Sequence, residues 1–119
     1  MEKKLQDSEL KVMNVIWREG EATAKHIAEV LGAEVGWNVN TTYTLIKRCI
    51  EKGAVERSEP NFLCRALVKK EDVQRAETDE LIGKLFDGSA DKLFAALLGR
   101  KKLSASELEK LRGMIDELE

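Results

Sequence analysis

The spacing of apolar residues changes near residue 53 of this chain, and this change limits the folds that the chain can adopt. Before that point apolar residues recur at intervals of three and four, which is the period of an amphipathic helix. After it, residues 54–68 follow the two-residue period of strands joined by a turn. Helices followed by a small hairpin predict a mainly α fold with a β-hairpin wing.

Three short helices are predicted in this first part, and each is followed by a glycine. They cover residues 7–19, 23–32 and 38–53, with Thr23 and Asn38 as N-caps. Both side chains can accept a backbone N–H at a helix start, and glycine is common where a helix ends, here at Gly20, Gly32 and Gly53. The expected inward stripes are Leu10, Met13, Ile16 and Trp17, widened by Val12 and Val15, then Ile27, Val30 and Leu31, then Thr42, Leu45, Ile46, Cys49 and Ile50.

The hairpin is expected from two short extended runs on either side of a turn. Residues 54–57 and 62–68 form the runs, and Ser-Glu-Pro-Asn at 58–61 has turn chemistry. Three helices followed by a hairpin is the order of a winged helix-turn-helix domain, which we expect to cover residues 1–69.

Residues 70–119 are expected to form three further helices. One covers 71–86, a second starts at Ser89 and ends near Leu98, and a third starts at Ser104, whose spacing to Glu107 is that of a capping box. About 50 residues in short helices are too few to form a stable core alone, so a second copy of the chain is expected to cover their apolar stripes. The expected dimerisation residues are Leu81, Leu85, Phe86, Leu93, Phe94, Leu97, Leu98, Leu108, Leu111 and Ile115.

The outward face of the third helix has short polar side chains at its start and basic side chains further along. Such side chains can reach base edges and phosphates when a helix lies in a major groove. A solvated polar face is the alternative, and the adjoining hairpin favours DNA. The predicted DNA-binding residues are Asn38, Asn40, Thr41, Tyr43, Thr44, Lys47 and Arg48 on the helix, with Arg57 and Arg65 on the wing.

Overall charge does not indicate nucleic-acid binding, because the net charge is −2. A winged-helix protein-interaction module without DNA binding therefore stays open as an alternative. No apolar run approaches the ~20 residues of a membrane span. The first residues lack the apolar core of a signal peptide, so a cytoplasmic protein is expected.

Cysteine and histidine are scarce, which limits the chemistry that the chain can carry. Cys49 and Cys64 form no Cys-x-x-Cys pair and are expected to be free thiols. With His26 they could supply three metal ligands, but their spacing matches no zinc pattern. We expect no metal, no cofactor and no enzymatic activity, because a nucleophile elbow and a glycine-rich phosphate loop are also missing. A thiol- or metal-responsive regulator is a further alternative.

Residues 36–48, Gly-Trp-Asn-Val-Asn-Thr-Thr-Tyr-Thr-Leu-Ile-Lys-Arg, resemble the recognition-helix signature of the penicillinase-repressor family, which includes the BlaI, MecI and copper-responsive CopY repressors. Residues 9–17, 52–55 and 103–111 also match family motifs, so the resemblance covers essentially the whole chain. It implies a homodimeric winged-helix repressor of dyad-symmetric operators upstream of resistance genes, such as those for β-lactamase. The family's base-contacting residues fall on Asn40, Thr41, Tyr43 and Thr44, and Arg48 matches the family's Arg.

The chain departs from the family pattern in four places. Tyr43 stands where relatives often have a basic residue, and Asn38-Val39 replaces a common Ser-Pro, so the operator sequence does not follow from the resemblance. The C-terminal cysteines of the copper sensors are missing, which argues against copper sensing. Antibiotic-responsive relatives are cleaved by a regulatory protease at an Asn-Phe pair. The matching place here is Ala96-Leu97, which we expect to form dimer core instead.

Overall fold

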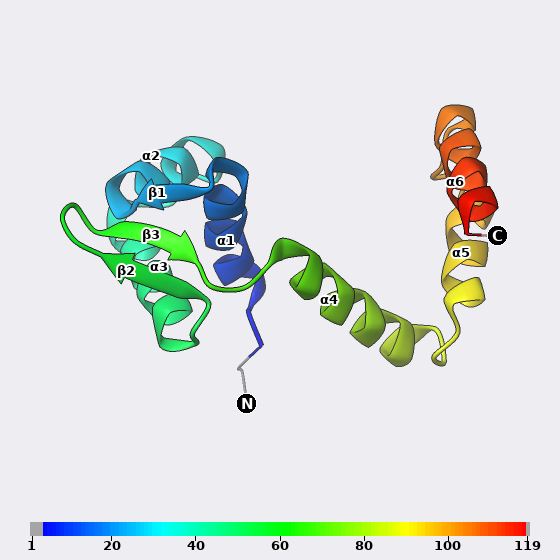
Figure 1. Ribbon diagram of the computed structural model, residues 1–119, viewed down its shortest axis with the longest axis horizontal. Coiled ribbons are helices and arrows are strands. Elements are labelled where there is room, and N and C mark those ends of the chain that lie inside the picture. The colour runs from blue at the N-terminus through cyan, green and yellow to red at the C-terminus, as the bar shows by residue number, and fades with distance from the viewer. Residues whose placement is uncertain (1–3, 119) are drawn as a thin grey trace. The chain divides into compact units, whose positions relative to one another are not determined.

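A computed structural model describes residues 4–118 of the chain. The chain divides into two compact units, Met1–Val73 and Gln74–Glu119. The domain boundary expected between residues 69 and 70 stays a prediction. The mainly α fold with a small β wing is confirmed by the element order, which is α1 (Asp7–Glu19), β1 (Glu21–Thr23), α2 (Ala24–Glu34), α3 (Val39–Glu51), β2 (Val55–Ser58), β3 (Leu63–Ala66), α4 (Lys70–Leu85), α5 (Ala90–Gly99) and α6 (Ala105–Glu117) (Figure 1).

Side-chain caps fix the starts of α2 and α3 as predicted. Thr23 Oγ1 accepts the backbone N–H of His26 at 3.1 Å, and Asn38 Oδ1 accepts that of Thr41 at 2.9 Å. Each bond satisfies a backbone donor that has no partner inside the helix. Local sequence is therefore enough to place the start of α3.

The end of α2 differs from the prediction. The helix continues through Gly32 to Glu34, and the chain leaves it at Gly36, which has φ +82°. The Gly36 N–H donates to the Leu31 carbonyl at 3.1 Å, which closes the helix end. Gly32 was the wrong choice because glycine within a helix costs only about 1 kcal/mol relative to alanine and is often tolerated.

The wing is one part of a three-stranded antiparallel sheet with the order β1-β3-β2. In β3, Cys64 pairs with Ala22 of β1 and with Arg57 of β2. Strand β1 was not predicted from the sequence, and the last strand was predicted to start at Phe62. Phe62 has φ +52°, a left-handed conformation that cannot continue a strand, so β3 begins at Leu63.

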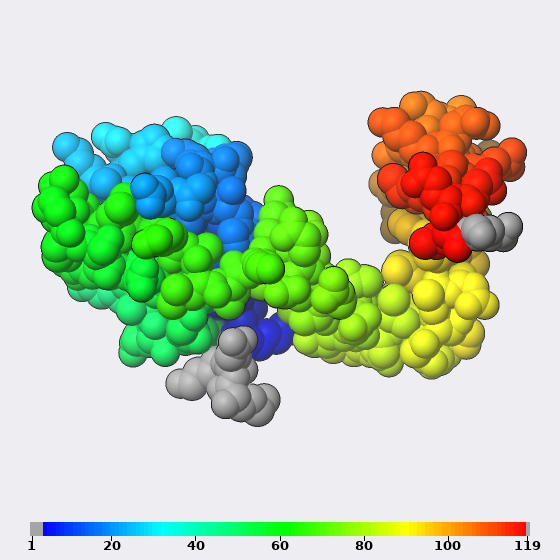
Figure 2. Space-filling view, viewed as in Figure 1, coloured from blue at the N-terminus to red at the C-terminus, as the bar shows by residue number. Residues whose placement is uncertain are grey.

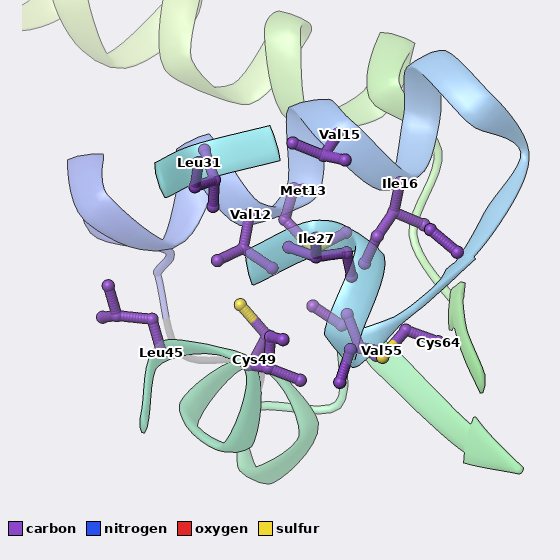
Figure 3. Close-up of a cluster of buried hydrophobic side chains, with 14 residues drawn as sticks. Val12, Met13, Val15, Ile16, Ile27, Leu31, Leu45, Cys49, Val55 and Cys64 are labelled. Carbon is purple, nitrogen blue, oxygen red and sulfur yellow. The ribbon is translucent and has the colours of Figure 1, made fainter. Parts of the chain in front are cut away.

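The core of the first unit lies between the three helices and the sheet, and buried side chains fill this space (Figure 3). Figure 2 shows the outer surface that covers it. Most of the predicted inward positions are buried. The fully or nearly buried apolar residues are Val12, Met13, Val15, Ile16, Ala22, Ala24, Ile27, Ala28, Leu31, Leu45, Ile46, Cys49, Ala54, Val55 and Cys64.

The buried face of α1 includes Met13 and Ile16 of the predicted stripe, and Val12 and Val15, which were predicted to widen it. It differs from the prediction in two places, because Leu10 is only partly buried and the carboxylate residue Glu9 is buried. Trp17 is also partly exposed, and its indole Nε1 donates to the Val68 carbonyl at 3.0 Å. The indole lies at the edge of the core, because its N–H needs a polar partner.

Helices α4, α5 and α6 bury none of their described side chains. Helix α6 has the predicted capping box, in which Ser104 Oγ accepts the Glu107 N–H at 3.1 Å and Glu107 Oε1 accepts the Ser104 N–H at 2.8 Å. Within residues 4–118, no helix is long and apolar enough to span a bilayer. The predicted dimerisation residues are exposed at Leu81, Leu85, Phe94, Leu98, Leu108 and Ile115 and half-buried at Phe86, Leu93, Leu97 and Leu111.

Candidate nucleic-acid interface

Helix α3 has two chemically different faces. Its inward face is buried and comprises Thr42, Leu45, Ile46 and Cys49. Its outward face is polar and basic, and comprises Asn40, Thr41, Thr44, Lys47 and Arg48, all exposed except the half-buried Thr41. The helix is therefore fixed to the core by one side and presents the predicted DNA-binding side chains on the other.

Several of these residues surround one open depression of about 340 Å³. Its lining residues are Asn38, Asn40, Thr41, Thr44, Leu45 and Arg48. Within the described part of the chain, neither Lys47 nor Arg48 forms an ion pair closer than 4.0 Å, so both cations are available to an anionic ligand. The first turn of α3 contains no acidic residue. Its backbone N–H groups and the positive end of the helix dipole therefore favour a phosphate there.

Tyr43 is a predicted site residue of α3 that does not line this depression. It is half-buried, and its ring meets that of Phe62 edge to face, with centroids 5.8 Å apart and planes at 84°. An aromatic pair of this geometry is attractive beyond the area it buries. Tyr43 thus joins α3 to the loop between β2 and β3, which projects from the first unit in Figure 1.

Both predicted wing arginines have partners on the wing itself. Arg57 Nε lies 2.5 Å from Glu59 Oε2, and its guanidinium carbon lies 3.7 Å from the Phe62 ring centroid. Arg65 lies 3.4 Å from a carboxylate oxygen of Glu56, across the strand pair. The hydrogen bond and charge of Arg57 hold the pKa of Glu59 below its usual value. The wing therefore presents compensated positive charge.

Sequence reasoning missed the partners of these arginines, although a signal was present. Arg57 and Glu59 are two residues apart, which places side chains on one face of an extended segment. Glu56 and Arg65 become neighbours only once the hairpin register is known, and Glu56 pairs with Arg65 in it. The contact between Arg57 and the Phe62 ring depends on left-handed backbone at Asn61 and Phe62, where the sequence has no glycine to indicate such a conformation.

The two thiols and the histidine lie apart from this face. Burial raises the pKa of Cys49 to about 12, with a further rise from nearby Glu9, and raises that of Cys64 to about 11. His26 Nε2 lies 2.8 Å from a Glu19 oxygen. Across residues 4–118, no cluster of three or more histidine, cysteine or acidic side chains is arranged to hold a metal ion.

A helix held by its inner face, with a polar outer face and a β wing beside it, defines the class of winged helix-turn-helix proteins. The family model described as "Penicillinase repressor" matches residues 5–117. The chain belongs to the penicillinase repressor family. Membership confirms the resemblance stated above, and it identifies the chain as a DNA-binding transcriptional repressor and not an enzyme.

Individual relatives agree with this assignment. The methicillin resistance regulatory protein MecI of Staphylococcus aureus strain N315 is 30% identical over 115 residues, which cover 95% of this chain and 94% of MecI. The solution structure of the DNA binding domain of the repressor BlaI is similar with a TM-score of 0.55 and 28% identity, covering 60% of this chain and 93% of that domain. The Bacillus licheniformis BlaI monomer in complex with the blaP half-operator has a TM-score of 0.50 and 29% identity, with the same coverage.

Proposed function

We propose that the chain represses transcription as a homodimer bound to a dyad-symmetric operator. Each protomer would lay α3 in a major groove, and the two half-sites would lie about one helical turn, or a multiple of it, apart. The observation that carries the proposal is the outward face of α3, where Asn40, Thr44 and Arg48 border one open depression on a helix fixed to the core.

The residues divide by the part of DNA that they would contact. Asn40, Thr41 and Thr44 are short and lie at the start of α3, where a helix in the major groove approaches base edges. Lys47 and Arg48 would reach phosphates or guanine. The BlaI structure in complex with a half-operator supports this use of the same domain.

Dimerisation is proposed to use the apolar side chains of α4, α5 and α6. None of these helices buries a described residue, and the large side chains of Leu85, Phe94 and Leu98 are about half exposed or more. A second copy would remove this surface from water at about 25 cal/mol per Å² of apolar area. The individual dimerisation residues predicted from the sequence remain predictions.

The proposal for the regulated genes rests on the relatives alone. MecI is named as a methicillin resistance regulator, so we propose that this repressor controls β-lactam resistance genes. We also propose that it acts in the cytoplasm, where operator DNA lies. Ala96 is exposed and Leu97 half-buried within α5. We assign both to the dimer contact, and cleavage there by a regulatory protease is the alternative.

The test is a mobility-shift titration of the full chain on the promoter fragment beside its own gene. Unrelated DNA serves as competitor, salt is varied, and light scattering gives the mass of the protein and its complex. We expect a discrete complex containing two protomers, whose affinity falls steeply with salt. Thr44→Ala should weaken it at unchanged thermal stability, whereas Lys11→Ala, an exposed change on α1, should not.

The interaction-module alternative predicts a different result. It is favoured by the net charge of −2 and by the pairing of both wing arginines with glutamates. In that case any shift would disappear with unrelated DNA, and Thr44→Ala would behave like wild type. Such an outcome would contradict the repressor proposal.

A further inference from the structure

Val39 is an exposed apolar residue at the first position of α3, and its contribution to helix stability does not explain why a valine stands there. Its side chain is 58% exposed. β-Branched residues are weaker helix formers than alanine, and the first turn of a helix favours Asp or Glu. The first turn of α3 contains no acidic residue at all. The position is therefore occupied by a side chain that helps neither the helix nor the core.

The surroundings of Val39 are polar. Its chain neighbours Asn38 and Asn40 line the open depression on α3, and Thr41 lines it too. One helical turn further along, Tyr43 packs against Phe62 of the wing. Val39 therefore lies at the tip of α3, on the side that continues toward the wing. An apolar group here would meet whatever ligand lies against the first turn of α3.

The chemistry of a base pair identifies what an isopropyl group can recognise. In the major groove, bases present hydrogen-bond donors and acceptors, and one apolar group, the C5-methyl of thymine. An isopropyl group cannot pair with a donor or acceptor and would leave it unsatisfied. Contact with a thymine methyl is the one base contact that benefits from valine.

We propose that Val39 is a specificity-determining residue that selects thymine at one position of each half-site through its C5-methyl group. This proposal rests on the proposed function, in which α3 enters the major groove. Asn40, Thr41 and Thr44 then read neighbouring positions by hydrogen bonds, and Val39 adds an apolar contact beside them.

The test removes the methyl group from DNA and the isopropyl group from the protein separately. Binding sites are first selected from random duplexes with the full-length wild-type chain. Each thymine of the selected site is then replaced in turn by deoxyuridine, which pairs identically but lacks the methyl group. Wild type, Val39→Ala and the control Val35→Ala are titrated on every duplex. Val35 is also exposed, at 40%, but lies in the turn before α3.

We expect one deoxyuridine position per half-site to weaken wild-type binding about fourfold, the factor for one methyl group returned to water. Val39→Ala should lose this sensitivity at that position alone, and Val35→Ala should keep it. Equal thermal unfolding of the three proteins shows that the fold is unchanged. The proposal is overturned if no deoxyuridine position weakens wild type, or if Val39→Ala keeps the same sensitivity. A selection that enriches no sequence contradicts the proposed function itself, and the proposal falls with it.

Discussion

The ammonium group of Lys52 lies 2.5 Å from Oε1 of Glu9, and so joins the C-cap of α3 to the first turn of α1. Glu9 is 1% exposed, and the same oxygen accepts the Gln6 N–H at 2.8 Å. Lys52 Nζ also donates to the Lys4 carbonyl at 2.8 Å. The end of the proposed recognition helix is therefore fixed to α1 by a covered ion pair whose groups have further hydrogen bonds.

Removing the cation should destabilise the fold. Lys52→Met leaves the Glu9 carboxylate covered and without its counter-charge, which should lower the free energy of unfolding by roughly 3 kcal/mol. Lys47→Met is the matched control, because Lys47 is exposed on the same helix. Urea unfolding of both variants followed by circular dichroism gives the comparison. Equal midpoints for the two would show that the pair contributes nothing to stability.

The same pair predicts how stability depends on pH. Burial alone would raise the pKa of Glu9, but the Gln6 N–H and the Lys52 ammonium outweigh burial and hold this pKa below the ordinary value of a glutamate. A carboxylate with a lowered folded-state pKa stabilises the protein above its unfolded pKa, and this contribution is lost as pH falls through the folded pKa. Wild type should therefore lose its stability advantage over Glu9→Gln progressively as the pH falls below about 4.3, the ordinary pKa of a glutamate. Parallel stability curves from pH 7 to pH 3 would contradict this assignment.

Features that depend on neighbouring residues could be predicted from the sequence, and features that depend on distant ones could not. The caps Thr23, Asn38 and Ser104 act within three residues, and all three helices begin where they predicted. The outward face of α3 follows from its period. Strand β1 exists only because it pairs with β3, some 40 positions away, and its three residues have no strand pattern of their own.

The candidate site shows the same division. The exposure of Thr44 and Arg48 was predictable from helix period. The Glu9–Lys52 pair joins residues 43 positions apart, and no local pattern indicates that a carboxylate belongs in the core. Tyr43 was predicted to face DNA because helix period places it on the side away from the apolar stripe. Its contact with Phe62 depends on how the wing folds back, which periodicity does not describe.

Thr42 offers a test of the interior of α3. It is 0% exposed, and its Oγ1 has no hydrogen-bond partner among the described residues. Thr42→Val keeps the shape and removes the unsatisfied hydroxyl, so stability should stay the same or rise by about 1 kcal/mol. Thr44→Val is the control on the exposed face, where stability should not change and operator affinity should fall. Thermal unfolding checks the first expectation, and a clear loss of stability in Thr42→Val would show that the hydroxyl is satisfied.

Removing each of two neighbouring charges on the wing, Arg57 and Glu59, should have opposite effects on DNA binding. Arg57→Ala should weaken DNA binding and reduce the salt slope by about one, as expected for one lost phosphate contact. Glu59→Gln should tighten binding, because it removes the anion that now holds Arg57 Nε and would repel a phosphate. Titrations at several salt concentrations measure both. If Arg57→Ala leaves the salt slope unchanged, Arg57 serves to hold Phe62 in place and makes no phosphate contact.

Thiol reactivity separates this repressor from a redox-responsive regulator. Burial raises the pKa of Cys49 to about 12 and of Cys64 to about 11, so both thiols are protonated at neutral pH, and both are fully covered by the core. The thiolate is the reactive form. A disulfide-exchange reagent should therefore label neither cysteine in the native protein within minutes, yet label both in denaturant. DNA binding should be the same with and without the reagent. Rapid native labelling that abolishes DNA binding would instead support a thiol-responsive regulator, because it would require the core around Cys49 to open under native conditions.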